Sequence, residues 1–448
     1  MMGRQVEQAA LFYEFSLERH VPSDHLLRSI DRFVELGALR GELGAFYSHL
    51  GRPSVDPELM IRMLLVGYCF GIRSERRLCE EVHLNLAYRW FCRLGLQGEV
   101  PDHSTFSKNR HGRFRQSDLL RRVFEAVLRR CIDEGLVGGE NFAVDASLIK
   151  ADANRQNGIE GGRGLPEQAS GRAIQEYLAV LDDAAFGAAS EVMPKFISPA
   201  DPAARWTGAH GGQAFFAYAT NYLIDTDHAI IVDVEATTAI RQAEVLAARR
   251  MIERTAKNLA LQPRRLLGDS AYGSAEMLGW LVSERRIEPH VTVLDKSTRH
   301  DGTFSREDFQ YHPERDVYVC PGGKALITTG TRVNDDATVL YRASKADCQS
   351  CILKSRCCPN TPLRRVPRSI HEGARDMARA IAKSFEGGVS RRLRKKVEML
   401  FAHLKRILKL DRLRLRGPTG ARDEFLLAAT AQNLRKLAKL IPIPAPAQ

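Results

Sequence analysis

The chain has 448 residues, of which 44% are hydrophobic and 27% charged, and its formal net charge is +12. That length predicts two or three domains, and that apolar fraction excludes an intrinsically disordered chain. The positive charge favours an anionic partner, either nucleic acid or an anionic membrane surface.

Hydropathy and cysteine usage predict a cytoplasmic protein that does not enter a membrane. The longest apolar stretch, 60–72, is interrupted by Arg62 and is shorter than the roughly 18 residues that a membrane span needs. Charged side chains occupy the first 15 residues, where a signal peptide would be apolar. Nine cysteines, an odd number, indicate reduced thiols or metal ligands rather than a disulfide framework.

Residues 1–136 are predicted to form a helical domain. Apolar residues recur at helical spacing over 26–36, Asp56 and Ser74 are candidate N-caps, and a turn at 101–105 leads into a basic helix. Short helices with exposed basic positions fit a helix-turn-helix-like DNA-binding region. They fit a helical packing or dimerisation module equally well.

Residues 137–295 are predicted to form an α/β core with a mixed sheet, because strands are followed by alternating helices and strands. A Gly-rich loop is expected over 158–166. The predicted strands are 141–145, 213–225, 228–235, 265–269 and 289–294, and the predicted helices are 242–258 and 274–285.

Residues 296–385 are predicted to interrupt this core as a polar, turn-rich insertion with five of the nine cysteines. Its expected edges are the segments 295–298 and 385–388. A long helix and a last helix near 424–440 return to the core over 386–441, and a Pro-rich tail, 442–448, ends the chain.

Two carboxylates are predicted at strand ends. Asp145 ends the apolar run Phe142-Ala143-Val144, and Asp269 ends Leu266-Leu267-Gly268. Open α/β sheets bind ligands at the carboxyl ends of their strands, and two carboxylates there suit a divalent metal. The alternative is that each Asp only caps the turn that follows it.

A third carboxylate, Glu398, lies in a strongly basic helix. Between Arg391 and Arg416 there are eleven Lys or Arg residues against two acidic ones. Arg394 and Lys405 share a helix face with Glu398, beside an apolar stripe. Glu398 is therefore either an ion-paired helix residue or a metal ligand among cations that hold phosphates.

The insertion contains a candidate zinc site. Cys348 and Cys351 form a Cys-x₂-Cys pair, with Cys320 upstream and Cys357 downstream. Four such thiolates are typical of structural zinc, which would stabilise a segment with little apolar material of its own. Reduced thiols without metal are the alternative. The other four cysteines, Cys69, Cys79, Cys92 and Cys131, fall in apolar helical patterns and are predicted core residues.

These segments resemble the DDE transposases of bacterial insertion sequences, in the broad IS-four-like and IS-five-like group. The resembling motifs are Ala143-Val144-Asp145-Ala146-Ser147, Gly268-Asp269-Ser270-Ala271-Tyr272-Gly273, and the spacing of Arg394, Glu398 and Lys405. In that family a Tyr precedes the last three residues, and Arg391 stands in its place. Further similar segments are Tyr88-Arg89-Trp90-Phe91, 101–107, 210–222 and 225–228. The resemblance thus covers nearly the whole chain.

The resemblance implies a ribonuclease-H-like core that cleaves DNA and transfers strands. Asp145, Asp269 and Glu398 are expected to hold two Mg²⁺ or Mn²⁺ ions, which suits phosphodiester cleavage. The expected DNA contacts are Arg391, Arg394 and Lys405, and the expected supports of the metal ligands are Asp152 and Tyr272.

The expected partners are the element's terminal repeats and a target duplex, bound by a homodimer in the bacterial nucleoid. The alternatives are a non-catalytic DNA-binding protein derived from a transposase and a nuclease of the same fold without strand transfer. The sequence leaves open the repeat sequence, the target preference, hairpin formation, the oligomeric state and the activity of the element.

Overall fold

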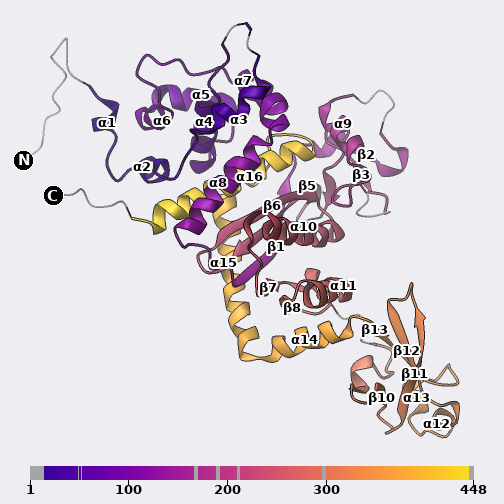
Figure 1. Cartoon of the computed structure of the whole chain (residues 1–448). Coiled ribbons are helices and arrows are strands. Elements are labelled where there is room, and N and C mark those ends of the chain that lie inside the picture. The colour runs from indigo at the N-terminus through magenta and orange to yellow at the C-terminus, as the bar shows by residue number, and fades with distance from the viewer. Residues whose placement is uncertain are drawn as a thin grey trace, which may run out of the picture. The chain divides into compact units, whose positions relative to one another are not determined.

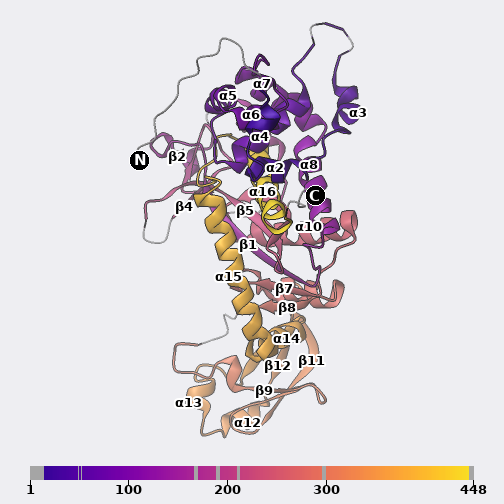
Figure 2. The same cartoon turned by 90° about the vertical axis from the view of Figure 1, so that its left-hand side faces the viewer.

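The computed structural model describes residues 15–442 except 49, 52, 166–169, 188–191, 209–211 and 295–298 (Figures 1 and 2). The chain is a mixed α/β protein with two compact units. Unit 1 comprises Met1–Gly139, Val144–Gln262 and Lys396–Gln448, and unit 2 comprises Glu140–Ala143 and Pro263–Lys395. Parts of the predicted segments 158–166, 210–222, 295–298 and 442–448 lie outside the described residues.

The N-terminal part of unit 1 is helical, as predicted. Asp56 accepts a hydrogen bond from the Glu58 amide at 2.9 Å, and Ser74 caps the next helix in the same way. The helix predicted over 26–36 ends sooner, at Asp31. The elements are α1 Leu17–His20, α2 Leu26–Asp31, α3 Leu39–Leu43, α4 Pro57–Cys69, α5 Glu75–Leu84, α6 Leu86–Phe91, α7 Ser104–Asn109 with the π turn Arg110–Phe114, and α8 Leu119–Asp133.

The last helix, α16 (Pro418–Leu440), is the central helix of unit 1. It contacts α2, α4 and α8 as well as strand β6, and Figure 1 shows it running alongside α8. The Asn433 side chain accepts from the Ile231 amide at 2.9 Å and donates to the Ile231 carbonyl at 2.8 Å. A helix from the end of the chain therefore holds the N-terminal helices and the sheet together.

The sheet of unit 1 is built around a long hairpin. Strand β5 (Phe215–Asp225) pairs antiparallel with β6 (Ile230–Thr238) and with β4 (Arg205–Thr207), and β1 is its other neighbour. Helix α10 (Arg241–Leu259) packs on β5 and β6. The predicted hairpin and helix are confirmed. The smaller elements are the turns Arg155–Asn157 and Gly161–Arg163, helix α9 Arg172–Ala179, and the strand pair β2 Ile159–Glu160 and β3 Phe196–Ile197.

Strand β1 is longer than predicted, and this corrects the placement of Asp145. The strand runs from Asn141 to Lys150, so Asp145 lies within it and not at its end. The strand continues because Ile149, a β-branched residue that favours extended backbone, is buried.

In unit 2, the first residues of β1 pair in parallel with β7 (Arg265–Gly268), and β7 pairs in parallel with β8 (Glu288–Val291). Helix α11 (Ala275–Gly279) continues as the π turn Trp280–Glu284. Helix α14 (Glu372–Lys383) packs on α11 and β8. The predicted strand–helix–strand order is therefore confirmed.

The cysteine-containing segment is a five-stranded antiparallel sheet with its own core, a sheet that the sequence did not predict. Phe309, Tyr318, Leu326, Tyr341 and Val366 are buried together in it. The expectation that this segment has little apolar material was therefore wrong. The elements are β9 Gln310–His312, β10 Val317–Val319, β11 Ala325–Val333, β12 Thr338–Arg342, α12 Lys345–Gln349, α13 Lys354–Cys357 and β13 Arg365–Ser369, with the strand order β13-β12-β11-β10-β9.

Helix α15 (Phe385–Arg406) carries Glu398. The glycines Gly387 and Gly388 had predicted a segment edge, but they lie in the first turn of this helix. Val397, Leu400 and Leu404 form its buried stripe, as the sequence predicted.

Candidate active site and nucleic-acid interface

Asp145 is half-buried within β1. Its Oδ1 accepts a hydrogen bond from the Ala146 amide at 2.8 Å. The residues before it, Phe142 to Val144, are fully buried, so the strand backbone that carries this carboxylate is rigidly packed.

Asp269 follows β7 directly, as predicted. Its Oδ1 accepts from the Ala271 amide at 2.7 Å and caps the short turn Ser270–Tyr272. Tyr272, the last residue of this turn, is buried. A Cβ at Gly273 would lie 2.0 Å from the Thr292 carbonyl oxygen, so only glycine fits there. The Asp-Ser-Ala-Tyr-Gly motif therefore fixes the loop that presents the Asp269 carboxylate.

Glu398 is exposed on α15, and within the described residues it forms no ion pair, although cations surround it in the sequence. Phe401, one turn further on, packs against the Tyr222 ring with centroids 5.6 Å apart. Lys405 is half-buried, and burial lowers its pKa while nearby Asp411 opposes that shift. An ion-paired role for Glu398 thus finds no partner in the described part of the chain.

The other two predicted DNA contacts lie in the part of α15 that belongs to unit 2. Arg391 is exposed and donates to the Ala382 carbonyl at 2.8 Å. Arg394 is half-buried.

The three predicted catalytic carboxylates belong to different units. Asp145 and Glu398 are in unit 1, and Asp269 is in unit 2. Among the residues that the structure describes, no three His, Cys, Asp or Glu side chains are placed to hold a metal ion together. The convergence of Asp145, Asp269 and Glu398 therefore stays a prediction.

Asp152, a predicted support of the metal ligands, pairs with cations that follow α15. Its carboxylate lies 3.2 Å from Arg412 Nη2 and 3.0 Å from Arg416 Nε. The Leu413 amide also donates to the Lys150 carbonyl at 2.7 Å. Asp152 therefore connects the segment after α15 to the end of β1. The sequence did not predict this role, although Arg412 and Arg416 both belong to the basic run 391–416.

The five cysteines of unit 2 gather in one part of its antiparallel domain. A Cβ at Gly322 would lie 3.7 Å from the sulfur of Cys320 and 3.6 Å from that of Cys351. Burial raises the pKa of the Cys348 thiol, and it raises the pKa of Cys357 to about 11. Both thiols also interact with that of Cys358, a residue left out of the predicted zinc set.

The four N-terminal cysteines are packing residues, as predicted. Cys69, Cys92 and Cys131 are buried, and Cys79 is half-buried. Burial raises the pKa of each of the three buried thiols to about 12, so they stay protonated and unreactive at neutral pH.

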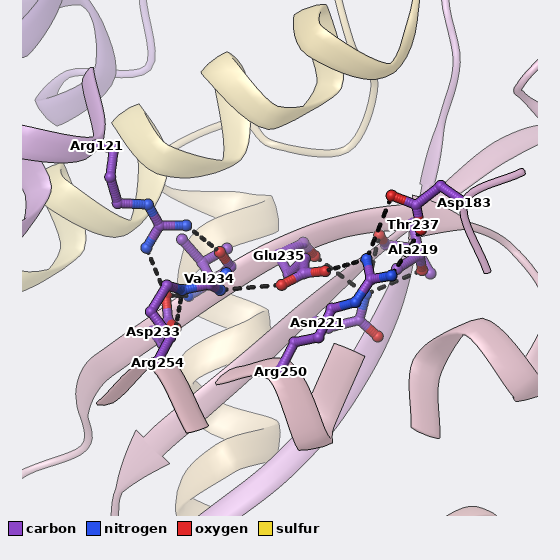
Figure 3. Close-up of polar contacts among 10 residues, drawn as sticks. All are labelled: Arg121, Asp183, Ala219, Asn221, Asp233, Val234, Glu235, Thr237, Arg250 and Arg254. Carbon is purple, nitrogen blue, oxygen red and sulfur yellow. Dashed lines mark hydrogen bonds and ion pairs between the residues drawn. The ribbon is translucent and has the colours of Figure 1, made fainter. Parts of the chain in front are cut away.

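An ionic network that the sequence did not predict links α8, β6 and α10 (Figure 3). Arg121 on α8 contacts the Asp233 carboxylate at 2.5 Å and the Val234 carbonyl at 2.8 Å. Arg254 on α10 reaches Asp233 at 2.8 Å and Glu235 at 3.0 Å.

The network continues along β6. Arg250 bridges Asp183 at 2.7 Å and Glu235 at 3.4 Å. Asn221 donates to the Glu235 carbonyl at 3.0 Å and to Thr237 Oγ1 at 3.0 Å. Each carboxylate of the network therefore has a guanidinium partner, which indicates a structural fastening of two helices to the sheet.

No helix of the described residues has both the length and the apolar character needed to span a bilayer.

Comparison with known proteins identifies two segments. Residues 15–112 match the family model Transposase domain (DUF772), and residues 319–438 match the model Transposase DDE domain. A solved structure described as a cryo-EM structure of the piggyBac transposase synaptic complex with hairpin DNA covers 93% of this chain and 73% of its own, at 10% identity and a TM-score of 0.32. A score that low does not establish a common fold. The two transposase models, one over the N-terminal helices and one over the segment that contains Glu398, identify the chain as a DDE-type transposase of the insertion-sequence kind, an enzyme of DNA transposition.

Proposed function

We propose that this transposase cleaves the ends of its element and joins them to target DNA with Asp145, Asp269 and Glu398 as ligands of two Mg²⁺ or Mn²⁺ ions. The match of the DDE domain to the segment with Glu398 carries the proposal. Three carboxylates are the hard oxygen donors that these ions prefer. Bound ions of this kind activate water and stabilise the leaving oxygen.

The described surroundings of the carboxylates support these roles. The hydrogen bond of Asp269 uses Oδ1, and Glu398 has no ion-pair partner among the described residues. Arg391, Arg394 and Lys405 neutralise DNA phosphates along α15, and buried Tyr272 anchors the Asp269 loop. Asp152 supports the site indirectly, through the segment after α15.

We also propose a ribonuclease-H-like core. The strand order is β6-β5-β1 in unit 1 and β1-β7-β8 in unit 2, which supports this fold. The domain division that goes with it is a helical region over 1–136, core segments over 137–295 and 386–441, and an insertion over 296–385.

The test of function is a cleavage and joining assay on DNA that carries the element's ends. Wild-type protein should give joined products with Mg²⁺. Asp269→Asn should give neither cleavage nor joining while still binding DNA, because Asn keeps the N-cap and removes the charge. Glu386→Gln, on the same helix as Glu398, is the matched control and should stay active.

Two outcomes of that assay favour the alternatives. Cleaved but never joined ends indicate a nuclease of the same fold. Binding without cleavage by the wild type indicates a non-catalytic DNA-binding protein.

A structural zinc ion in unit 2 is a further part of the proposal. Cys320, Cys348 and Cys351 supply three thiolates, and Cys357 supplies the fourth, with Cys358 as its competitor. The neighbouring sulfurs support this set: those of Cys320 and Cys351 both lie close to Gly322, and the Cys348 thiol interacts with those of Cys320 and Cys357. Zinc binding would release the protons of the buried Cys348 and Cys357 thiols. Protein purified without chelator should contain one zinc per chain, and Cys351→Ser should contain less than half of that. Zinc-free wild type of unchanged protease resistance would make the cysteines plain thiols.

The proposed assembly is a homodimer on DNA, in a bacterial nucleoid, because two element ends must be joined in one event. The mass of the protein on paired end duplexes tests it, and one chain on two ends would contradict it.

A further inference from the structure

A hollow of about 860 Å³ lies within unit 1, between the second half of α15, the second half of α16 and the turn between β5 and β6. Five cations line it: Lys396, Arg406, Arg435, Lys436 and Lys439. One carboxylate, Asp227, lines it as well. We call this hollow the α15–α16 groove.

The charges of these cations are not neutralised by carboxylates in the described part of the chain. Lys396 Nζ donates to the Thr226 carbonyl at 3.0 Å, and Arg435 Nη1 donates to the Cys69 carbonyl at 2.9 Å. Carbonyl oxygens orient a cation but leave its net charge in place. None of the five forms an ion pair with a described residue. The groove therefore presents nearly its full positive charge.

The cations are close enough to oppose one another. Burial lowers the pKa of Lys436, and the charges of Lys439 and Lys396 add to that shift. Burial also lowers the pKa of His403, and Arg435, Lys436 and Lys439 add to it. Crowded like charges destabilise each other until an anion binds, so the arrangement suits a polyanion.

Part of the groove lies on the face of α15 opposite the carboxylate proposed for catalysis. At roughly 100° per residue, Lys396, His403 and Ile407 share one face of the helix, and Glu398 and Lys405 lie about 180° away. The buried stripe of Val397, Leu400 and Leu404 runs along one side of the helix, between these two faces. Ala402 and Arg406 also line the groove and lie nearer to Glu398, about 40° and 80° away around the helix. Lys396, His403 and Ile407 are therefore the α15 part of the groove that faces away from Glu398.

We propose that the α15–α16 groove binds the phosphate backbone of a second DNA segment, separate from the segment at the catalytic carboxylates. The inference rests on the proposed function, because cleavage and joining bring an element end and a target duplex to one protein. A second copy of the chain fits the groove less well, because two such faces would bring five cations against five. Exposed Met399 and Ile407 in the groove, 70% and 48% accessible, make a protein partner the alternative that the experiment must separate.

The experiment measures the affinity of the full chain for a duplex without element ends, as a function of salt. The test variant combines Arg406→Gln, Lys436→Gln and Lys439→Gln. The control combines Arg77→Gln, Lys257→Gln and Lys345→Gln, three exposed cations outside the groove. Each phosphate contact contributes about 0.9 to the slope of log K against log salt. The test variant should therefore lose about three units of slope, and the control less than one.

Thermal melting of the variants and a cleavage and joining assay separate loss of DNA binding from loss of folding. If the triple variant melts early, Lys439→Gln alone, at an exposed position on α16, should lose about one unit of slope. The groove variant should still cleave a single end but join it to target DNA at least tenfold more slowly. An unchanged slope overturns the proposal. A changed oligomeric mass with an unchanged slope overturns it too and assigns the groove to a second copy. Loss of cleavage in Asp269→Asn is measured separately, so failure of the groove and failure of the catalytic assignment are distinguishable.

Discussion

The ionic network that links α8, β6 and α10, here called the β6 network, and the α15–α16 groove both contain arginines, but within the described residues only the arginines of the network are paired with carboxylates. In the network, Arg121, Arg250 and Arg254 each contact a carboxylate. In the groove, Arg406 and Arg435 share a hollow with three lysines, and none of these cations has an ion pair among the described residues. Both regions belong to unit 1, so one compact body holds compensated and uncompensated cations.

This difference separates structural from ligand-binding charge. A buried carboxylate with two guanidinium partners stabilises a packing arrangement, and losing one partner leaves an uncompensated charge. Cations gathered without an ion pair in the described residues cost stability, which indicates that their partner comes from outside the chain. The same reasoning applies to the negative charge of Glu398, which lies exposed on α15 without an ion pair in the described residues. Its partner is therefore also expected from outside the chain, as a cation.

The largest effect is expected from the network. Asp233→Ala removes the carboxylate that Arg121 and Arg254 share, and should destabilise unit 1 by about 3–5 kcal/mol, the usual cost of breaking a buried pair. Thermal melting of the full chain measures it. Arg77→Ala, which breaks an exposed pair with Glu81, is the control and should cost less than about 1 kcal/mol. If the two variants melt at the same temperature, the network is not structural.

An intermediate effect is expected from charge reversal in the groove. Lys439→Glu places a carboxylate beside Lys436 and should weaken binding of non-specific DNA by at least tenfold, while Lys257→Glu should have a much smaller effect. The melting temperature of Lys439→Glu should rise or stay unchanged, because the new charge compensates its neighbours. A variant that melts earlier with unchanged DNA affinity would make the groove a structural feature like the network.

A smaller effect is expected from pH. His403 faces Arg435, Lys436 and Lys439 on α16, with Lys396 and Arg406 on its own helix and Asp227 and His228 at the turn. Its pKa is below the usual value in the free protein, and DNA phosphates would raise it. DNA binding is then accompanied by protonation of His403. The affinity for DNA should therefore increase as pH falls through the pKa of His403 in the complex, by less than about tenfold for this one group.

That pH effect has a counterpart in stability. Since the folded pKa of His403 is lowered, the unfolded chain binds the proton more readily, and this group destabilises the protein as pH falls below the unfolded value, about 6.5. The control is His403→Gln, which should remove both dependences. A variant with the wild-type pH profile of DNA binding would show that phosphate does not reach His403.

Local chemistry explains which parts of the fold could be predicted. Asp56 and Ser74 start helices because their side chains cap neighbouring amides. The β5–β6 hairpin follows from two strand-like runs on either side of the turn 225–227, and α10 was predicted as the helix 242–258. Asp269 was placed correctly because a short buried strand, β7, ends just before it.

Long-range contacts explain what could not be predicted. The sheet of β9 to β13 includes strands of only three to five residues, β9, β10, β12 and β13, too short to show a clear periodicity. The end of β1 was missed because Asp145 resembles a strand terminator. The groove joins cations on α15 and α16 that are about thirty residues apart or more in the chain, and nothing in either segment alone indicates that they share a hollow.

Metal counting tests the catalytic assignment most directly. The measurement is the number of Mn²⁺ ions that each chain binds in its complex with an element end. Paramagnetic resonance or calorimetry gives this number. Wild type should bind two ions at the catalytic site, and Asp269→Asn and Glu398→Gln should each bind fewer, whereas Glu386→Gln should match wild type. Two ions of wild-type affinity in both ligand variants would show that Asp269 and Glu398 do not hold the metal.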